Sequence, residues 1–143
     1  MNPRLVIDAS VAVKWLIPEA GSEQAIALIA DGHDLYAPDL LVSEIGNVLW
    51  KKSRGKAISA TATQRLMTEF LSIRLHWIDS RSLAADALEI ARRYDRSFYD
   101  SLYLALALAV DGELVTADER FANALASTPH AKRIHSLAGM AGA

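Results

Sequence analysis

The sequence predicts a single α/β domain with a five-stranded, mainly parallel sheet flanked by helices. Short apolar runs alternate along the chain with longer segments whose apolar residues recur at helical spacing. This alternation is typical of strand–helix–strand units and therefore of parallel strands. The chain has 143 residues, enough for one domain with its own core and too few for two. We expect the domain to cover residues 1–138 and a frayed tail to cover 139–143.

The chain opens with a strand and two short helices. Residues 4–7, Arg-Leu-Val-Ile, form a continuous apolar run that fits a buried strand. Helical spacing follows over 9–16 and stops near Pro18, and it returns over 22–30 until Asp31-Gly32. Both stops have a physical reason, because proline cannot continue a helix and glycine readily adopts the conformation at a helix end.

A second strand and two longer helices come next. Residues 34–37 fit a strand that a proline closes. The following helix is predicted over 39–52, with Asp39 as its N-cap. The next helix is predicted over 61–72, where the motif Thr61-Ala-Thr-Gln64 has the spacing of a capping box.

The second half of the chain continues the alternation. Residues 75–78 fit a third strand, and Asp79-Ser80 caps a helix that runs to about Arg93. The most apolar helix covers 98–110 and ends at Asp111-Gly112. The remaining expected elements are a strand over 113–116, a short helix over 119–126 and an edge strand over 133–135.

Composition excludes several classes of protein. The chain has no cysteine, which excludes disulfide scaffolds, thiolate metal sites and cysteine nucleophiles and fits a reducing compartment. Asp8 and Lys14 interrupt the region where a signal peptide needs apolar residues. The longest strongly apolar run, 102–110, is far shorter than the roughly 20 residues of a membrane span. We therefore expect a cytoplasmic protein that does not enter a membrane.

Four acidic residues lie beside apolar segments, where a carboxylate is costly unless something pairs with it. Asp8 ends the first strand, and Asp118 follows the fourth. Glu44 and Asp100 lie in helices, on or beside their core-facing sides. Ligands of parallel sheets bind beyond the carboxyl ends of the strands, where the strand order reverses. If the first and fourth strands are neighbours there, Asp8 and Asp118 face one crevice.

A shared pocket for these carboxylates calls for a cation. Two carboxylates about 4 Å apart repel each other by roughly 4 kcal/mol at an effective dielectric constant of 20. Oxygen ligands favour Mg²⁺ or Mn²⁺ over zinc, and the implied chemistry is hydrolysis of a phosphate ester. A structural interpretation stays open for each residue, because Asp8, Asp100 and Asp118 are also placed as helix N-caps and Glu44 as a solvated edge residue.

Four short motifs surround these acids. In chain order they are Val-Ile-Asp8-Ala-Ser10-Val, Pro38-Asp-Leu-Leu-Val-Ser-Glu44-Ile, Phe-Tyr-Asp100-Ser-Leu-Tyr and Leu-Val-Thr116-Ala-Asp118-Glu. Together, in this order, they resemble the PIN-domain ribonucleases, and most closely the VapC toxins of bacterial toxin–antitoxin pairs, and the resemblance covers essentially the whole chain. One mild departure is Ser101, where relatives often carry a small apolar residue.

The resemblance implies a fold, a site and partners. It implies a parallel sheet in the order 3-2-1-4-5 and hydrolysis of RNA that depends on Mg²⁺ or Mn²⁺. It also implies inhibition by a cognate VapB-like antitoxin and a homodimer. Ser10 and Thr116 match hydroxyl positions that support the metal shell or its water. The implied catalytic and metal-holding residues are Asp8, Glu44, Asp100 and Asp118.

Two basic clusters lie near the acidic motifs in the sequence. Their side chains could hold RNA phosphates near the metal, since such contacts are largely independent of base sequence. An alternative for each residue is a solvated helix end that complements the helix dipole. The first cluster contains Lys51, Lys52, Arg54 and Lys56, and the second contains Arg92, Arg93 and Arg96.

Other functions stay open at this point. A phospho-acceptor signalling domain that uses Mg²⁺ usually has adjacent acids after its first strand, whereas Asp8 is followed by Ala9 and Ser10. A PIN-like domain that binds RNA or a partner without cleavage usually lacks part of the acidic quartet, which is complete here. A phosphatase or a DNA nuclease would use the same metal chemistry, and only substrate trials separate these from a ribonuclease.

Overall fold

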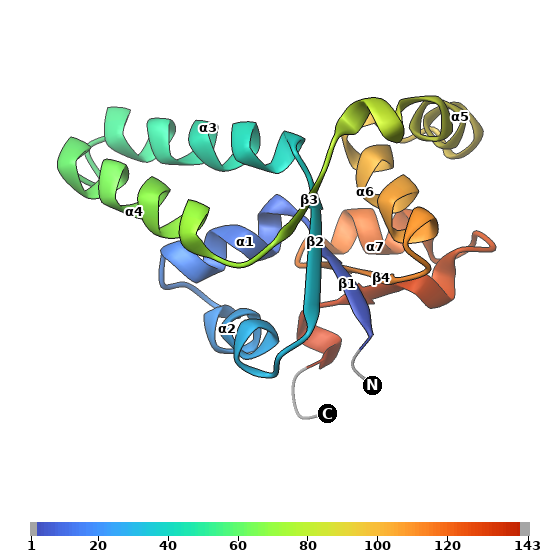
Figure 1. Ribbon diagram of the computed structural model, residues 1–143, viewed down its shortest axis with the longest axis horizontal. Coiled ribbons are helices and arrows are strands. Elements are labelled where there is room, and N and C mark those ends of the chain that lie inside the picture. Colours follow the sequence, from blue (N-terminus) through green and yellow to red (C-terminus); the bar gives the residue numbers. More distant parts are fainter. Residues whose placement is uncertain (1–2, 141–143) are drawn as a thin grey trace.

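Five parallel strands form the centre of the structure, a computed structural model that describes residues 3–140. The sheet has the order β3-β2-β1-β4-β5, which confirms the expected topology (Figure 1). β1 pairs with β2 on one side and with β4 on the other, so the strand order reverses at β1. The strands are β1 (Arg4–Ile7), β2 (Asp34–Pro38), β3 (His76–Ile78), β4 (Glu113–Thr116) and β5 (Ile134–Ser136).

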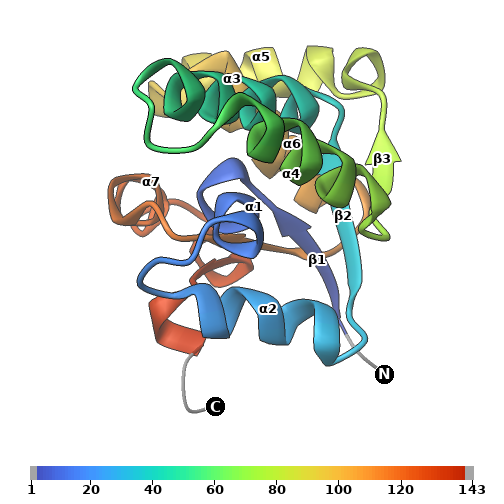
Figure 2. The ribbon, with the colours of Figure 1, turned by 90° about the vertical axis from the view of Figure 1, so that its left-hand side faces the viewer.

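Seven α-helices and three short 3₁₀ turns complete the part of the chain that the structure describes. Figures 1 and 2 show α3 and α4 as a hairpin that extends to one side of the sheet. The helices are α1 (Ala9–Leu16), α2 (Ser22–Ala30), α3 (Leu40–Arg54), α4 (Ala60–Ser72), α5 (Ala84–Tyr94), α6 (Phe98–Ala109) and α7 (Glu119–Leu125). The 3₁₀ turns are η1 (Ser80–Ser82), η2 (Ala131–Arg133) and η3 (Ala138–Met140).

The sheet separates two hydrophobic cores. Successive side chains of a strand point to opposite faces, so Leu5 and Ile7 pack with α1 to α4 while Val6 packs with α5 to α7. β4 repeats this division, with Val115 on the first face and Leu114 on the second. Because both faces are covered, consecutive residues of β1 and β4 after their charged first positions, Leu5 to Ile7 and Leu114 to Val115, are apolar and buried.

Helix starts are the places where the structure corrects the sequence prediction. Asp39 is already in a helical conformation (φ −62°, ψ −17°), so its carboxylate does not cap α3 and instead accepts hydrogen bonds from Ser80. The predicted capping box at Thr61 is also wrong. Ser59 has the extended conformation that a cap requires, and its hydroxyl accepts from the Ala62 N–H at 3.1 Å.

The remaining differences are small shifts of boundaries. Asp79 caps the turn η1 rather than a helix, and α5 begins only after Leu83. Of the tail expected over 139–143, Gly139 and Met140 belong to η3, and the last three residues lie outside the described part of the chain.

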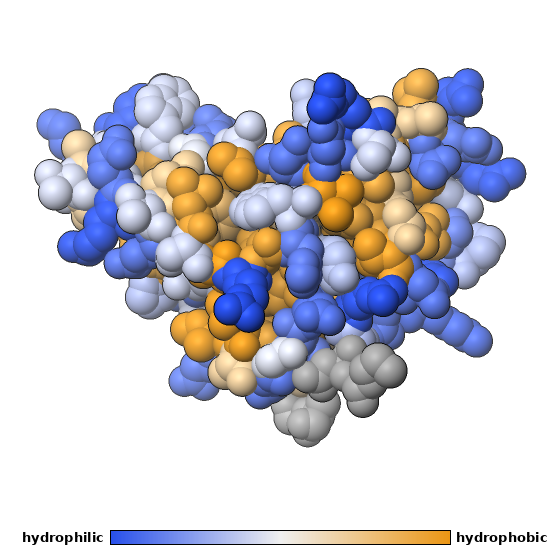
Figure 3. Space-filling model, viewed as in Figure 1, coloured by the Kyte–Doolittle hydropathy of each residue, from blue (hydrophilic) through white to orange (hydrophobic). Residues whose placement is uncertain are grey.

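The surface carries hydrophobic and hydrophilic areas side by side. Figure 3 shows hydrophobic patches near the centre of one face and hydrophilic side chains over most of its edge. Among residues 3–140, no helix has both the length and the apolar character that a bilayer crossing requires.

Gly112, which directly precedes β4, lies close to the backbone of β1. A Cβ atom at Gly112 would lie 2.6 Å from the backbone oxygen of Arg4. Gly112→Ala is therefore expected to lower the free energy of unfolding by about 1 to 3 kcal/mol, because a backbone oxygen cannot move aside as a flexible side chain would. Gly139→Ala is the matched control, since nothing lies within 4 Å of its added Cβ. Equal urea midpoints for the two variants would contradict the prediction.

Candidate active site

The four predicted acidic residues border the carboxyl edge of the sheet, where the strand order reverses. Asp8 directly follows β1 and caps α1, and Asp118 lies just past β4 and caps α7. Glu44 lies near the start of α3, and Asp100 lies in the first turn of α6. Figure 1 shows the first turns of α3 and α6 close to the upper ends of β1 and β2. Four separate elements thus bring one acidic residue each to this edge.

Asp8 is the most buried of these residues, with 7% of its surface exposed. Its Oδ1 accepts hydrogen bonds from the Ser10 hydroxyl (2.6 Å) and the Val11 N–H (3.2 Å), and its Oδ2 accepts from the Thr116 hydroxyl (2.5 Å). Burial raises the pKa of Asp8 to about 6, although the hydrogen bonds from Ser10, Thr116 and Val11 oppose this rise. The residue therefore carries a costly charge near neutral pH.

Ser10 and Thr116 connect the first acidic motif to the last one. The Ser10 Oγ accepts from the Ala117 N–H (2.8 Å), and the Thr116 Oγ1 accepts from the Asp118 N–H (3.0 Å). Each hydroxyl thus donates to Asp8 and accepts from the loop after β4. The two residues that were predicted to support the site hold the Asp8 carboxylate and the loop of Asp118 in a fixed relation.

Glu44 is paired with a tyrosine that was not among the predicted site residues. The Tyr103 hydroxyl donates a hydrogen bond to Glu44 Oε1, which links α3 to α6. Tyr103 is 2% exposed, and burial together with the charge of Glu44 raises its pKa, so it remains a donor. A tyrosine within the apolar run 102–110 is a signal that could have identified it, because a buried hydroxyl needs a partner.

Electrostatic coupling joins all four carboxylates in a series. Burial raises the pKa of Glu44, and the charge of Asp100 raises it further. Burial likewise raises the pKa of Asp100, and the charge of Asp118 adds to the rise while Arg96 opposes it. Since the charge of Glu44 also contributes to the raised pKa of Asp8, the series runs from Asp8 through Glu44 and Asp100 to Asp118.

The cap interpretation is correct for two of these residues and wrong for a third. Asp8 and Asp118 do cap helices, and Asp118 Oδ1 accepts from the Arg120 and Phe121 N–H groups at 3.0 and 3.3 Å. Asp100 is not a cap, because the Ser97 hydroxyl accepts from the Asp100 N–H at 3.0 Å. A residue can therefore cap a helix and belong to the acidic site, because the cap uses only Oδ1 of Asp8 and of Asp118.

The donor set suits a hard divalent cation in charge and in atom type. All four side chains offer carboxylate oxygens, and each lies close enough to another to be coupled to it. Within residues 3–140, however, no three acidic or histidine side chains already form a metal-coordinating cluster. Repulsion between uncompensated carboxylates favours separated side chains, so a cation would have to draw these oxygens together.

The predicted basic residues do not gather in one place. Arg96 lies near enough to lower the pKa of Asp100. Lys51, Lys52 and Arg54 lie at the end of α3, and Arg54 is about 15 Å along the helix from Glu44. The Arg54 guanidinium lies over the exposed Trp50 ring, 4.6 Å from its centroid.

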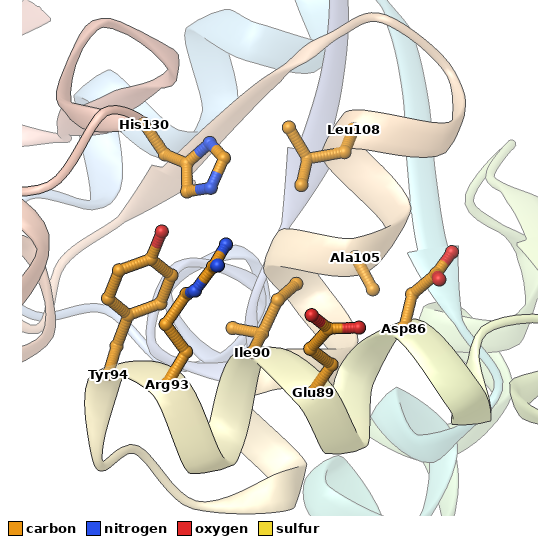
Figure 4. Close-up of a pocket in the computed structure, with 8 residues that line it drawn as sticks. All are labelled: Asp86, Glu89, Ile90, Arg93, Tyr94, Ala105, Leu108 and His130. Carbon is orange, nitrogen blue, oxygen red and sulfur yellow. The ribbon is translucent and has the colours of Figure 1, made fainter.

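Arg93 faces a separate pocket between α5 and α6. Figure 4 shows Arg93 and His130 at one end of this pocket and Asp86 at the other, above an apolar floor that includes Ile90. None of the four acidic residues of the candidate site lines the pocket. Arg93 is thus directed to a different part of the surface from Arg96, although both belong to one predicted cluster. Arg92 is exposed near the end of α5.

Comparisons with known proteins agree with this fold. The sequence profile of the PIN domain matches residues 5–125. Ribonuclease VapC3 of Pyrobaculum aerophilum is 30% identical over 123 residues, which cover 83% of this chain and 92% of that protein. The crystal structure of PAE2754 from Pyrobaculum aerophilum superposes with a TM-score of 0.72 at 23% identity, covering 95% of this chain and 85% of that one. A toxin–antitoxin complex from Klebsiella pneumoniae contains a chain with a TM-score of 0.67 at 16% identity, covering 93% and 97%.

The buried charge of Asp8 predicts a pH-dependent effect on stability. The pKa of Asp8 is about 6 in the folded protein, so the carboxyl group keeps its proton up to about that pH, whereas an unperturbed aspartate has a pKa of 3.8. Ionisation of Asp8 therefore destabilises the folded state as the pH rises through this range. Without divalent cations at pH 7.5, Asp8→Asn should raise the free energy of unfolding by about 1 to 3 kcal/mol, and this gain should disappear at pH 4.

Thermal unfolding of both proteins at the two pH values, in the presence of a chelator, measures this effect. Asp86→Asn, at an exposed position on α5, is the control and should change little at either pH. A lower melting temperature for Asp8→Asn at pH 7.5 would mean that its hydrogen bonds outweigh the cost of its buried charge.

Proposed function

This chain belongs to the PIN-domain family, with VapC ribonucleases among its relatives, and we propose that it is a metal-dependent endoribonuclease that acts as the toxin of a toxin–antitoxin pair. One observation carries the proposal: four coupled carboxylates border the carboxyl edge of the sheet beside β1. The relationship to a ribonuclease over 83% of the chain supports RNA as the substrate.

Asp8, Glu44, Asp100 and Asp118 would hold Mg²⁺ or Mn²⁺. When bound, such an ion neutralises the carboxylates, activates water for attack on phosphorus and stabilises charge on the phosphate oxygens. The protein side chains would position the ion and accept the proton of the attacking water. Ser10 and Thr116 donate hydrogen bonds to the two oxygens of Asp8 and fix its carboxylate. Asp8 would therefore hold the ion rather than transfer a proton.

Glu44 is suited to accept a proton from the attacking water. The Tyr103 hydroxyl occupies its Oε1 and sets the orientation of the carboxylate. Burial and the charge of Asp100 raise the pKa of Glu44, which brings proton uptake closer to neutral pH. Arg96, whose charge lowers the pKa of Asp100, is a cation near enough to this edge to contact a bound phosphate.

The proposed partner is a VapB-like antitoxin that inhibits the enzyme. A chain of similar fold, matched over 93% of this chain, belongs to a toxin–antitoxin complex, and this likeness supports the proposed partner. A homodimer is part of the same proposal. Sedimentation of the purified chain at micromolar concentration tests it, and a mass of about 31 kDa, twice that of one chain, is expected.

RNA cleavage tests the proposed chemistry directly. Purified protein with Mg²⁺ should cut total RNA at discrete positions, and a chelator should abolish the cuts because the carboxylates cannot act without the cation. Glu44→Gln should lower the rate by about 100-fold or more, since it removes the proton acceptor and one metal ligand. Glu69→Gln, in an exposed ion pair on α4, should leave the rate unchanged.

Sequencing of the RNA ends gives the cut positions, and gel assays give the rates. Undiminished cleavage by Glu44→Gln, or cleavage that persists in excess chelator, would reject the proposed site.

Salt dependence tests the basic clusters. Binding of a single-stranded oligoribonucleotide to the Asp8→Asn protein should weaken with salt, because cations on the RNA are released as lysines and arginines replace them. Each residue that contacts a phosphate should add about 0.7 to the slope of log K against log salt. Lys51→Ala and Arg96→Ala are therefore each expected to reduce the slope by about that amount.

Lys132→Ala is the control variant, because Lys132 lies in η2 and belongs to neither basic cluster. Slopes that match the parent protein for both test variants would show that these side chains do not contact the RNA backbone.

A further inference from the structure

An open groove lies beside the acidic site, between the starts of α3 and α6 and the turn η1. It has a volume of about 600 Å³. Leu40 lines one side, Tyr99 and Phe98 line another, and Asp39 and Ser80 contribute polar atoms. None of these residues has a role in the mechanism proposed above.

The groove is continuous with the site through two helices. The Tyr103 hydroxyl donates to Glu44, so α3 and α6 are in contact at that point. Leu40 precedes Glu44 by four residues, and Tyr99 precedes Tyr103 by four residues. Four residues are about one helical turn, or 5.4 Å along the axis. The groove therefore begins one turn away from the Glu44–Tyr103 contact on both helices.

The aromatic side chains of the groove are unusually open to solvent. Tyr99 is 61% exposed and Phe98 is 38% exposed, whereas every residue from 101 to 107 in the same helix is buried. Both aromatic residues directly precede Asp100. A large exposed ring next to an active site is a binding feature more often than a packing feature, because it gains nothing from the core.

The polar wall of the groove offers hydrogen-bonding groups that are only partly used. Asp39 Oδ1 accepts from the Ser80 N–H at 3.2 Å and from the Ser80 hydroxyl. Asp39 Oδ2 has no hydrogen-bond donor among residues 3–140. Flat rings on one side and a free carboxylate oxygen on the other suit a planar ligand with polar edges.

We propose that this groove holds an unpaired nucleobase of the RNA substrate, stacked on Tyr99, next to the nucleotide that is cut. The proposal rests on the ribonuclease function proposed above and adds a substrate subsite to it. Bases of single-stranded RNA stack on exposed aromatic rings, and their edges hydrogen-bond to nearby polar groups. Bases within a duplex are stacked on each other and cannot enter, so the groove selects single-stranded RNA.

Binding to RNA that cannot be cut tests the subsite. In the Asp8→Asn background, fluorescence anisotropy measures the affinity for a labelled single-stranded oligoribonucleotide and for a duplex of the same sequence. Tyr99→Ala should weaken single-strand binding by about 5- to 150-fold, the range that loss of one stacked base gives. Tyr99→Trp should keep the affinity within about threefold, because it retains an aromatic ring. Leu88→Ala, an exposed apolar residue of α5, is the matched control and should have no effect.

Cleavage kinetics supply a second measurement in the otherwise unaltered protein. Tyr99→Ala should raise KM while kcat changes by less than about threefold, since the side chain holds substrate without touching the reacting atoms. Tyr99→Trp should restore KM. This pattern separates a binding role from a general loss of structure, which would lower the amount of active enzyme and hence kcat.

Several outcomes would overturn the subsite. Parent-like affinity and KM for Tyr99→Ala would do so, as would duplex binding as tight as single-strand binding. Sedimentation that shows a dimer for the parent and a monomer for Tyr99→Ala would instead assign this face to contact between two copies. The ribonuclease proposal is judged separately, by whether the parent protein cuts RNA in a chelator-sensitive way.

Discussion

The buried carboxylate of Asp8 is the constraint on which the rest of the site depends. It lies at the end of the central strand, where the sheet reverses its order, and it is held by hydroxyls from the start of α1 and the end of β4. A charge in this position is costly, and the cost rises because Glu44 is close enough to contribute. The divalent cation proposed for this site would offset that cost, because its charge compensates the carboxylates.

The two faces of the sheet contribute to the site in different ways. On one face α3 brings Glu44, and on the other α6 brings Asp100 and Tyr103. The Tyr103–Glu44 hydrogen bond closes the gap between the faces above the strand ends. The same meeting of α3 and α6 creates the groove beside the acids. The proposed catalytic groups and the proposed substrate subsite thus depend on one packing arrangement, and a change in the angle between these helices would disturb both.

Much of the fold was predictable because the signals are local. β1, α1, α2 and β4 were predicted with their observed bounds, since apolar runs and helical spacing mark them directly. Helix starts were predicted less well. Asp39 and Thr61 have residue types that cap helices, but a cap also depends on backbone conformation. Ser101, at a position where the resemblance implied a small apolar residue, is accommodated because its hydroxyl donates to the Ser97 carbonyl oxygen at 2.8 Å.

The sequence by itself determined which acids stand at strand ends and helix starts, because those positions follow from periodicity along a short segment. Only the tertiary structure decided which side chains meet. Thr116 reaches Asp8 across 108 residues and Tyr103 reaches Glu44 across 59. Arg96 lies close enough to Asp100 to lower its pKa, whereas Arg93 lines the pocket between α5 and α6. Contacts of this kind depend on strand order and on how helices pack against both faces of the sheet. Spacing along the chain does not encode them.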